Sequence, residues 1–294
     1  MRIVITGSQG FLGNNFAMYL KSTRGEAPLG LDIHPDADVS VDISDLNSLT
    51  STLKPDDLIY HFAAVADSSQ NAIDPYMVNK INIFGTLNVL EAALRVGASK
   101  VVLISSSWVY SAMVNPELQD KGDFSHRGSP HFYTTSKVCS ELLTQGYGYQ
   151  DINITIVRPF NPYGPNMWKG LVIREMLTRA SQGQNVLVYG DGSNRRSFIH
   201  TDDICHALEF VMDDKTNGKI YNLCGLESTS ILDLAQMISS RFGVGIDFKE
   251  SKVRKNEYYQ RESFTPRSNW DEFDWQPHMI IQDGLDMLIK NKSW

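Results

Sequence analysis

The first half of the chain alternates short apolar runs with longer amphipathic stretches. The apolar runs, which predict strands, cover residues 2–6, 29–33, 39–43, 57–64 and 100–105. The amphipathic stretches, which predict helices, cover residues 11–21, 44–53, 76–96 and the segment that begins at Tyr133. Repeated strand–helix alternation gives a parallel sheet with helices on both faces, so we expect an α/β fold with a doubly wound parallel sheet over residues 1–160.

The alternation becomes less regular after residue 151. Strands are expected at residues 153–157, 186–189, 197–200, 219–223 and 246–249. Helices are expected at residues 171–180, from residue 201 onward, and at residues 230–242 and 280–289. We interpret residues 161–294 mostly as a smaller α/β lobe that binds substrate, with later segments returning to the first domain, and we expect the ligand in the cleft between the two.

Composition and charge narrow the class of protein. With 294 residues, of which 42% are hydrophobic and 21% charged, the chain can bury a sizeable core. The net charge of −7 argues against a general nucleic-acid binder, whose surface would be basic. No apolar run approaches the ~18 residues of a membrane span, and no signal-peptide pattern precedes the first strand. The three cysteines have no metal-ligand spacing, so we expect reduced thiols, no metal and a soluble cytoplasmic protein.

A glycine-rich turn connects the first predicted strand to the first predicted helix. Gly7, Gly10 and Gly13 have the spacing GxxGxxG, one residue wider in its first step than the GxGxxG fingerprint of dinucleotide-binding proteins. Between a strand and a helix, such a turn places backbone N–H groups and the positive helix end against a pyrophosphate. Chance glycines in an ordinary turn are the alternative, but the position directly after the first strand favours a dinucleotide site.

Two acidic residues at strand ends are candidates for contacts with the adenosine half of a dinucleotide. Asp32 follows Gly13 by 19 residues, close to the roughly 20 expected for an acid that binds the ribose. A carboxylate there repels a 2′-phosphate, which favours NAD over NADP; the alternative is a turn residue at a strand end. Asp42 and Ile43 end the third predicted strand, and they either flank the adenine or are part of the strand end.

Some predicted elements contain residues that do not suit them. His61 lies in a buried strand, and we interpret it as a core histidine rather than a ligand. Ala63 and Ala64 end the same strand, and such small residues let a cofactor lie close to the backbone. Asn82 and Gly85 are unfavourable inside a helix, which indicates close packing or a buried polar contact there.

The candidate chemistry is a tyrosine and a lysine four residues apart, Tyr133 and Lys137. Residues at this spacing share one face of a helix, so the ammonium lies next to the phenol. A free tyrosine has a pKa of about 10, too high for a base at neutral pH, and a nearby cation lowers that pKa. The serines at residues 105–107 follow a strand, where ligands of open α/β sheets bind, and a serine hydroxyl can relay a proton to the substrate. Alone, the Tyr–Lys spacing is a weak signal that arises often by chance.

Taken together, these motifs resemble the extended short-chain dehydrogenase/reductase superfamily, in particular its nucleotide-sugar epimerase/dehydratase branch. The resemblance covers nearly the whole chain and is carried by TGSQGFLG at residues 6–13, YHFAA at 60–64, SSSWVY at 105–110, YTTSK at 133–137, RPFNPYGP at 158–165, YGDG at 189–192 and RSFIHTDD at 196–203. It implies a Rossmann-type sheet, NAD as the cofactor and a nucleoside-diphosphate sugar as the substrate. It also implies a homodimer built from the helices that contain Asn82 and Tyr133.

The resemblance assigns a role to each matching residue. The catalytic residues would be Tyr133 as the acid/base, Lys137 as its partner, and Ser106, which lies four residues before Tyr110. The cofactor would be bound by Gly7, Gln9, Gly10, Phe11, Leu12, Gly13, Asp32, Asp42, Ile43, Phe62, Ala63, Ala64, Asn82, Tyr133, Lys137 and Pro159. The substrate would be bound by Ser106, Ser107, Trp108, Tyr133, Asn161, Tyr189 and Arg196. An arginine suits a diphosphate because its planar fork donates two charge-assisted hydrogen bonds, although a surface salt bridge is the alternative for Arg196 and the expectation for Arg195.

Departures from the pattern of this branch bear on the reaction. Dehydratases of the branch follow their catalytic threonine with an acidic pair, whereas Ser107 and Trp108 follow Ser106 here, which disfavours a 4,6-dehydratase. Trp108, and Ser111 in place of a common glycine, either shape the sugar pocket or fill the core. Ser197 replaces a frequent aspartate after the arginine, which leaves the identity of the sugar open.

We therefore expect an NAD-dependent epimerase of a nucleoside-diphosphate sugar, acting at C4 through a transient 4-keto intermediate. The alternative enzyme is an NAD(P)H-dependent reductase of a 4-keto-6-deoxy nucleotide sugar; because such reductases often use NADPH, Asp32 counts against it. A non-catalytic dinucleotide-binding or RNA-associated relative is a different class. The presence of Ser106, Tyr133 and Lys137 and the negative net charge argue against that class.

Overall fold

The computed structural model describes residues 1–66, 74–112, 132–250 and 275–294. The chain divides into two compact units, of which the first comprises residues 1–159 and 205–222 and the second residues 160–204 and 223–294. The polar stretch of sequence at residues 252–271 lies outside the described residues.

A seven-stranded sheet forms the centre of the first unit, in the order β11-β6-β5-β4-β1-β2-β3. Its strands are β1 (Ile3–Thr6), β2 (Leu29–Asp32), β3 (Val39–Ser40), β4 (Leu58–His61), β5 (Lys100–Ile104), β6 (Asn153–Pro159) and β11 (Ile220–Leu223). The pairings from β3 through to β6 are parallel, and β11 extends the sheet beside β6. The predicted doubly wound parallel sheet is confirmed.

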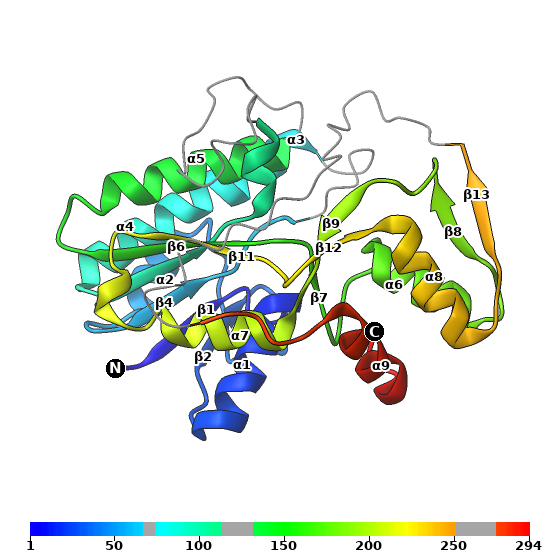
Figure 1. Ribbon diagram of the computed structural model, residues 1–294. Coiled ribbons are helices and arrows are strands. Elements are labelled where there is room, and N and C mark those ends of the chain that lie inside the picture. The colour runs from blue at the N-terminus through cyan, green and yellow to red at the C-terminus, as the bar shows by residue number, and fades with distance from the viewer. Residues whose placement is uncertain (67–73, 113–131, 251–274) are drawn as a thin grey trace. The chain divides into compact units, whose positions relative to one another are not determined.

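Helices cover both faces of this sheet (Figure 1). They are α1 (Phe11–Arg24), α2 (Leu46–Thr52), α3 (Pro75–Asn79), α4 (Thr86–Val96), α5 (Phe132–Tyr147) and α7 (Thr201–Phe210). One face packs against α2, α4 and α5 around an apolar core that includes Val4, Ile59 and Val101. On the other face, the hydroxyl of Tyr60 donates a hydrogen bond to the carbonyl of Leu208 in α7 at 2.7 Å. The side chains of successive strand residues thus serve opposite layers.

The prediction of one continuous helix over residues 76–96 is wrong in detail. A π-helix, Lys80–Gly85, separates α3 from α4. Within it, Asn82 is buried, and its side chain accepts a hydrogen bond from the backbone of Val65 at 2.8 Å and donates to the hydroxyl of Ser136 at 2.9 Å. The buried polar contact that the sequence indicates at this position therefore exists, and π-helical turns of this kind frequently mark functional sites.

The described part of the second unit contains three two-stranded sheets, β10-β7, β12-β9 and β13-β8. Its elements are β7 (Pro162–Tyr163), α6 (Val172–Ser181), β8 (Val186–Tyr189), β9 (Arg195–Ser197), β10 (Ile199–His200), β12 (Ser228–Ser230), α8 (Ile231–Phe242), β13 (Ile246–Lys249) and α9 (Ile281–Asn291). The single strand predicted at residues 197–200 is wrong, because the chain changes its pairing partner at Phe198: β9 pairs with β12 and β10 with β7. That this unit binds the substrate stays a prediction. Among the described residues, no helix has the length and apolar character to cross a membrane.

Candidate active site

The glycine turn lies where the sheet reverses its winding. From β1 the chain proceeds outward to β2 and β3, and then returns to β4 on the other side of β1, which is the point where open α/β sheets bind ligands. Gly7 has a φ of +72°, and a Cβ there would lie 2.6 Å from the backbone nitrogen of Ala63. A Cβ on Gly13 would lie 2.2 Å from the carbonyl oxygen of Gly7. These contacts are with backbone atoms that cannot move aside, so glycine is required at both positions.

Asp32 is fixed beside this turn. Its two carboxylate oxygens accept hydrogen bonds from the backbone N–H of Gln9 at 3.0 Å and of His34 at 3.1 Å. The side chain of Gln9 in turn donates to the carbonyl of Asp36 at 3.2 Å. The loop after β2 is thereby tied to the glycine turn, and the acid at the predicted ribose position lies next to the predicted pyrophosphate position.

The structure shows what Asp42 and Ile43 contact. Asp42 is exposed, and its carboxylate accepts the backbone N–H of Ser44 at 2.8 Å. Ile43 is buried, its carbonyl accepts the side-chain amide of Asn88 at 3.0 Å, and its Cδ1 would lie 2.5 Å from a Cβ on Gly85. Glycine inside the helix therefore provides space for Ile43. A contact of either residue with adenine stays a prediction.

The other candidate cofactor residues lie at three places: Phe11 and Leu12 begin α1, residues 62–64 follow β4, and Pro159 ends β6. Phe11 and Pro159 are buried, and Leu12, Phe62, Ala63 and Ala64 are half-buried. The hydroxyl of Thr6 at the end of β1 lies 2.7 Å from Nδ1 of His61 at the end of β4, and the other ring nitrogen of His61 lies 3.0 Å from the hydroxyl of Thr86. Burial lowers the pKa of His61 to about 3, so this residue is the neutral core histidine that the sequence predicts.

The three candidate catalytic residues come together at the end of β5. A short 3-10 helix, Ser107–Ala112, turns the chain after Ser106, and α5 carries Tyr133 and Lys137 on one face. A side-chain hydrogen bond joins Ser106 to Tyr133. The ammonium of the buried Lys137 donates to the carbonyl of Ile104 at 2.8 Å. The sequence predicts that one serine of residues 105–107 partners Tyr133, and Ser106 makes a hydrogen bond with it.

The electrostatics of the pair differ from the expectation. Burial raises the pKa of Tyr133 to about 12, although the hydrogen bond with Ser106 acts in the opposite direction. Burial lowers the pKa of Lys137 to about 8, with the charge of Glu141 acting in the opposite direction. The expected lowering of the tyrosine pKa by the lysine is therefore absent from this structure, because burial of the phenol is the largest effect on its pKa.

Sequence reasoning missed a buried ion pair next to these residues. Glu141 and Arg158 are both fully buried, and the guanidinium donates to both carboxylate oxygens, at 3.0 and 2.6 Å. Ser105 donates its hydroxyl to the same carboxylate. A third N–H of Arg158 donates to the hydroxyl of Tyr110 at 2.6 Å. The available signal was the spacing, because Glu141 lies four residues after Lys137 and eight after Tyr133 on one helix face.

The candidate substrate residues fall into separate groups. Ser107 is buried and Trp108 half-buried in the 3-10 helix after Ser106, whose hydroxyl accepts the backbone N–H of Trp108 at 3.2 Å. In the second unit, Asn161 has a φ of +38° and donates its side-chain amide to the carbonyl of Ser197, the neighbour of Arg196, at 3.1 Å. Asn161 and the strand that carries Arg196 therefore lie together.

Arg195 and Tyr189 occupy other surroundings in the second unit. Arg195 donates to the hydroxyl of Ser228 at 3.2 Å, in agreement with a structural role for this arginine. Tyr189 ends β8 in a different small sheet and is 60% exposed. The substrate contacts predicted for Asn161, Tyr189 and Arg196 remain predictions.

The sequence profile of the NAD-dependent epimerase/dehydratase family matches residues 3–224. The chain belongs to this family. A UDP-N-acetyl-alpha-D-glucosaminuronate decarboxylase of Bacillus cytotoxicus is 32% identical over 81% of this chain and 79% of its own length. A dTDP-glucose 4,6-dehydratase of Streptomyces antibioticus is 26% identical over 100% of this chain and 94% of its own length. The protein is thus an NAD-dependent enzyme of the extended short-chain dehydrogenase/reductase type, in the nucleotide-sugar epimerase/dehydratase branch.

Solved structures agree on the fold. The UDP-glucose 4-epimerase of Thermotoga maritima, solved with UDP-glucose, superposes with a TM-score of 0.87 at 22% identity over 99% of this chain and 98% of that one. A dTDP-glucose 4,6-dehydratase of Streptomyces venezuelae, solved with NAD, superposes with a TM-score of 0.84 at 24% identity over 100% of this chain and 98% of that one. The same backbone therefore supports different reactions, and the side chains must decide between them.

The residues of the first unit fit NAD, the cofactor of this family. The first turn of α1 has neither a side-chain cap nor an acidic residue, so its N–H groups are open to a pyrophosphate. Gly7 and Gly13 leave out the Cβ atoms that would close the turn, and Asp32 provides a carboxylate for ribose hydroxyls. Within the described part of the chain, no cluster of three or more His, Cys, Asp or Glu side chains is arranged to hold a metal ion.

Proposed function

We propose that this enzyme is an NAD-dependent epimerase of a nucleoside-diphosphate sugar that inverts C4 through a transient 4-keto sugar. The observation that carries the proposal is the grouping of Ser106, Tyr133 and Lys137, beside which the described residues place no free carboxylate. Oxidation and re-reduction at one carbinol need a single proton relay, which these residues provide. Elimination of water across C5 and C6 needs an additional acid and base.

Each residue has a defined task in this proposal. Tyr133 takes the proton of the 4-hydroxyl, directly or through Ser106, and later returns it. Its half-buried phenol holds a proton at neutral pH, so a cation must favour the phenolate during the reaction, and Lys137 is the cation on the same helix face. Bound NAD supplies the hydride acceptor and donor. Asp32 favours NAD over NADP because its carboxylate would repel a 2′-phosphate.

The positions after Ser106 argue against dehydration. Ser107 and Trp108 stand where dehydratases of this branch carry an acidic pair. Among the described residues around Ser105 and Ser106, the nearby carboxylate is Glu141, and both of its oxygens are bound to Arg158. A carboxylate in a bidentate, charge-assisted pair with an arginine is poorly suited to act as the additional acid or base of an elimination.

A decarboxylase is the second candidate, because the 32% identical relative bears that name. Oxidation of a nucleotide-linked uronic acid at C4 gives a β-keto acid, which loses carbon dioxide without a further acid–base pair. The absence of acids after Ser106 therefore does not weigh against this reaction. The reductase of 4-keto sugars also uses the same groups, although Asp32 disfavours NADPH.

One experiment separates these reactions. The purified protein is incubated with UDP-, GDP-, dTDP- and CDP-linked hexoses and uronic acids, with and without added NAD(P)H, and the products are identified by NMR. A C4 epimer without net change in cofactor supports the proposal; a pentose, a 4-keto-6-deoxy sugar or consumption of NAD(P)H assigns the chain to another reaction.

The tyrosine itself is tested with Tyr133→Phe, which removes the transferable proton and keeps the ring. We expect turnover to fall by at least about a hundredfold, because general acid–base groups contribute about 10²–10⁴-fold. NAD affinity and thermal unfolding should remain close to those of the wild type. Full activity in this variant would refute the assignment of Tyr133 as the acid/base.

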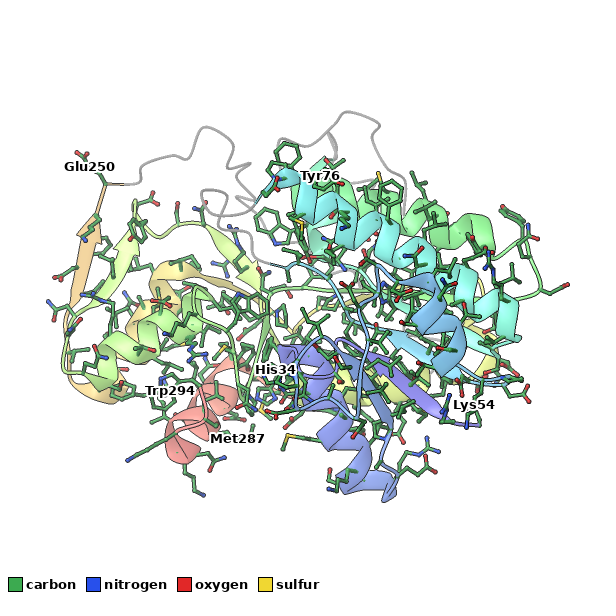
Figure 2. The ribbon with its side chains drawn as sticks, turned by 180° about the vertical axis from the view of Figure 1, so that it is seen from behind. His34, Lys54, Tyr76, Glu250, Met287 and Trp294 are labelled. Carbon is green, nitrogen blue, oxygen red and sulfur yellow. The ribbon has the colours of Figure 1, made fainter. Side chains whose placement is uncertain are left out.

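The proposal includes a homodimer formed through α3, the π-helix and α5. These elements pack together and expose the large apolar side chains of Tyr76, Met77, Phe84, Phe132 and Leu142. Figure 2 shows Tyr76 at the periphery of the first unit, on α3. The resemblance described above pairs these helices between two subunits. Sedimentation analysis tests the assembly: a monomer at assay concentration would exclude it.

A further inference from the structure

Three residues of α5 engage three consecutive residues at the end of β5. Tyr133, Lys137 and Glu141 follow one another at intervals of four, so they form one row along the helix. Tyr133 binds the hydroxyl of Ser106, Lys137 binds the carbonyl of Ile104, and Glu141 binds the hydroxyl of Ser105. Glu141 therefore continues the row formed by Tyr133 and Lys137, and it contacts Ser105, the residue before Ser106.

The surroundings of Glu141 leave its carboxylate fully engaged. Its oxygens accept the hydroxyl of Ser105 and two N–H groups of Arg158. The guanidinium of Arg158 lies 4.9 Å from the ring centre of Tyr110 and donates to its hydroxyl, which donates to Asn222 at 2.7 Å. A buried ion pair is weak evidence for stability, because a well-packed apolar pair often stabilises a fold equally well. The location of this pair calls for another explanation.

We propose that Glu141 is a positioning residue for the reaction, which holds the Ser105–Ser106 turn through the Ser105 hydroxyl and supports the ammonium of Lys137 through its negative charge. The proposal rests on the proposed function, since it assumes that Ser106, Tyr133 and Lys137 carry the chemistry. Arg158 fixes the direction of the carboxylate and prevents it from acting as a base.

The charge of Glu141 has a defined effect on Lys137. Burial lowers the pKa of Lys137 to about 8, and Glu141 opposes that change. Among the described residues, the other titratable or charged groups on α5 itself are Tyr133, Cys139 and Tyr147. The elements that pack against α5 carry Tyr76, Lys80, Glu91, Arg95, Tyr110 and Arg158, and the charge of Lys137 acts on His61 from β4. His61 is neutral, Glu91 binds Tyr147 at the far end of the helix, and Arg158 is paired. Glu141 is therefore the negative group that acts on Lys137.

The test is Glu141→Gln, which keeps the shape and an acceptor oxygen but removes the charge. A lysine is charged below its pKa, so a lower pKa confines the charged form to lower pH. We expect the alkaline limb of the kcat profile to move to lower pH by about one unit, with kcat at about pH 8 reduced about fivefold or more. KM should change little, because the substrate contacts remain in place.

A second readout needs neither substrate nor cofactor. NMR titration of ¹³C-labelled lysine side chains, with the Lys137 signal identified by Lys137→Arg, follows the ammonium directly. We expect Lys137 to release its proton at lower pH in Glu141→Gln than in the wild type. If the wild type converts no nucleotide sugar, the proposed function fails while this titration still decides the electrostatic role of Glu141.

Two further variants keep the test decisive if Glu141→Gln folds poorly. Ser105→Ala removes one donor and no charge, and it should lower kcat several-fold without moving the alkaline limb. The double variant Glu141→Gln with Arg158→Gln removes both charges of the pair, so the titration of Lys137 should return toward that of the wild type. An unchanged kcat in Ser105→Ala overturns the role in holding the turn.

The matched control is Asp57→Asn. Asp57 is buried and pairs with Arg2 at 2.7 Å. It precedes β4 and therefore lies at the amino ends of the parallel strands, whereas Ser105 lies at their carboxyl ends. We expect this variant to lose thermal stability but to keep the alkaline limb of the wild type. Glu141→Gln overturns the proposal if it behaves like the control, with lower stability, an unchanged limb and an unchanged Lys137 titration.

Discussion

Replacing the buried Lys137 by methionine should stabilise the cofactor-free protein while abolishing its activity. Lys137 is 5% exposed, and burial lowers the pKa of its ammonium from 10.5 to about 8. At about 1.4 kcal/mol per pH unit, this difference corresponds to about 3 kcal/mol against the folded state at neutral pH. Methionine leaves the carbonyl of Ile104 without its donor, which costs about 1 kcal/mol. The expected net gain is about 2 kcal/mol.

The gain has a characteristic dependence on pH. Below about pH 8 both folded and unfolded chains hold the Lys137 proton, so the wild type bears the full cost. Between about 8 and 10.5 only the unfolded chain holds it, and the stability of the wild type rises with pH. The advantage of Lys137→Met is therefore largest at neutral pH and disappears by about pH 10.5.

Urea unfolding of NAD-free protein at several pH values measures this difference. Lys100 is also buried with a pKa of about 8, but its titration is common to both proteins and cancels in the comparison. Lys54→Met is the control, because Lys54 is exposed and lies at the edge of the molecule in Figure 2. We expect this control to change stability by less than about 0.5 kcal/mol. A Lys137→Met protein that is less stable than the wild type near neutral pH, or a difference that is independent of pH, would refute the reasoning.

Two further variants test the cofactor site. Gly13→Ala places a Cβ 2.2 Å from the carbonyl oxygen of Gly7, so the free energy of unfolding should fall by about 1–3 kcal/mol. NAD affinity, measured by calorimetry, should fall at least about tenfold. An affinity equal to that of the wild type would contradict the requirement for glycine in this turn. Asp32→Ala removes the carboxylate that faces the backbone of Gln9, so NAD should bind more weakly and the preference over NADP should shrink. An unchanged ratio of the two affinities would show that Asp32 does not select the cofactor.

The extent to which the sequence predicts this site depends on the range of the interactions involved. Gly7, Gly13 and Asp32 were predictable because the turn and its acid follow from local spacing and from the rule that ligands bind at the carboxyl ends of strands. A serine partner for Tyr133 was predictable from the position of residues 105–107 after a strand, and the resemblance identified that serine as Ser106. The pair of Glu141 with Arg158 was not predictable, because its partners are separated along the chain and each residue alone looks like an ordinary surface charge.

Local patterns in the sequence were sufficient to predict the parallel sheet and the succession of strands and helices along the chain, because hydrophobic periodicity, glycine spacing and capping act over a few residues. Three other features depend on tertiary packing. Asn82 is buried within a π-helix, and the strand predicted at residues 197–200 divides at Phe198. Burial raises the pKa of Tyr133, although the spacing between Tyr133 and Lys137 predicts a lowered pKa. Each of these depends on packing against distant segments, and desolvation exists only once those segments have come together.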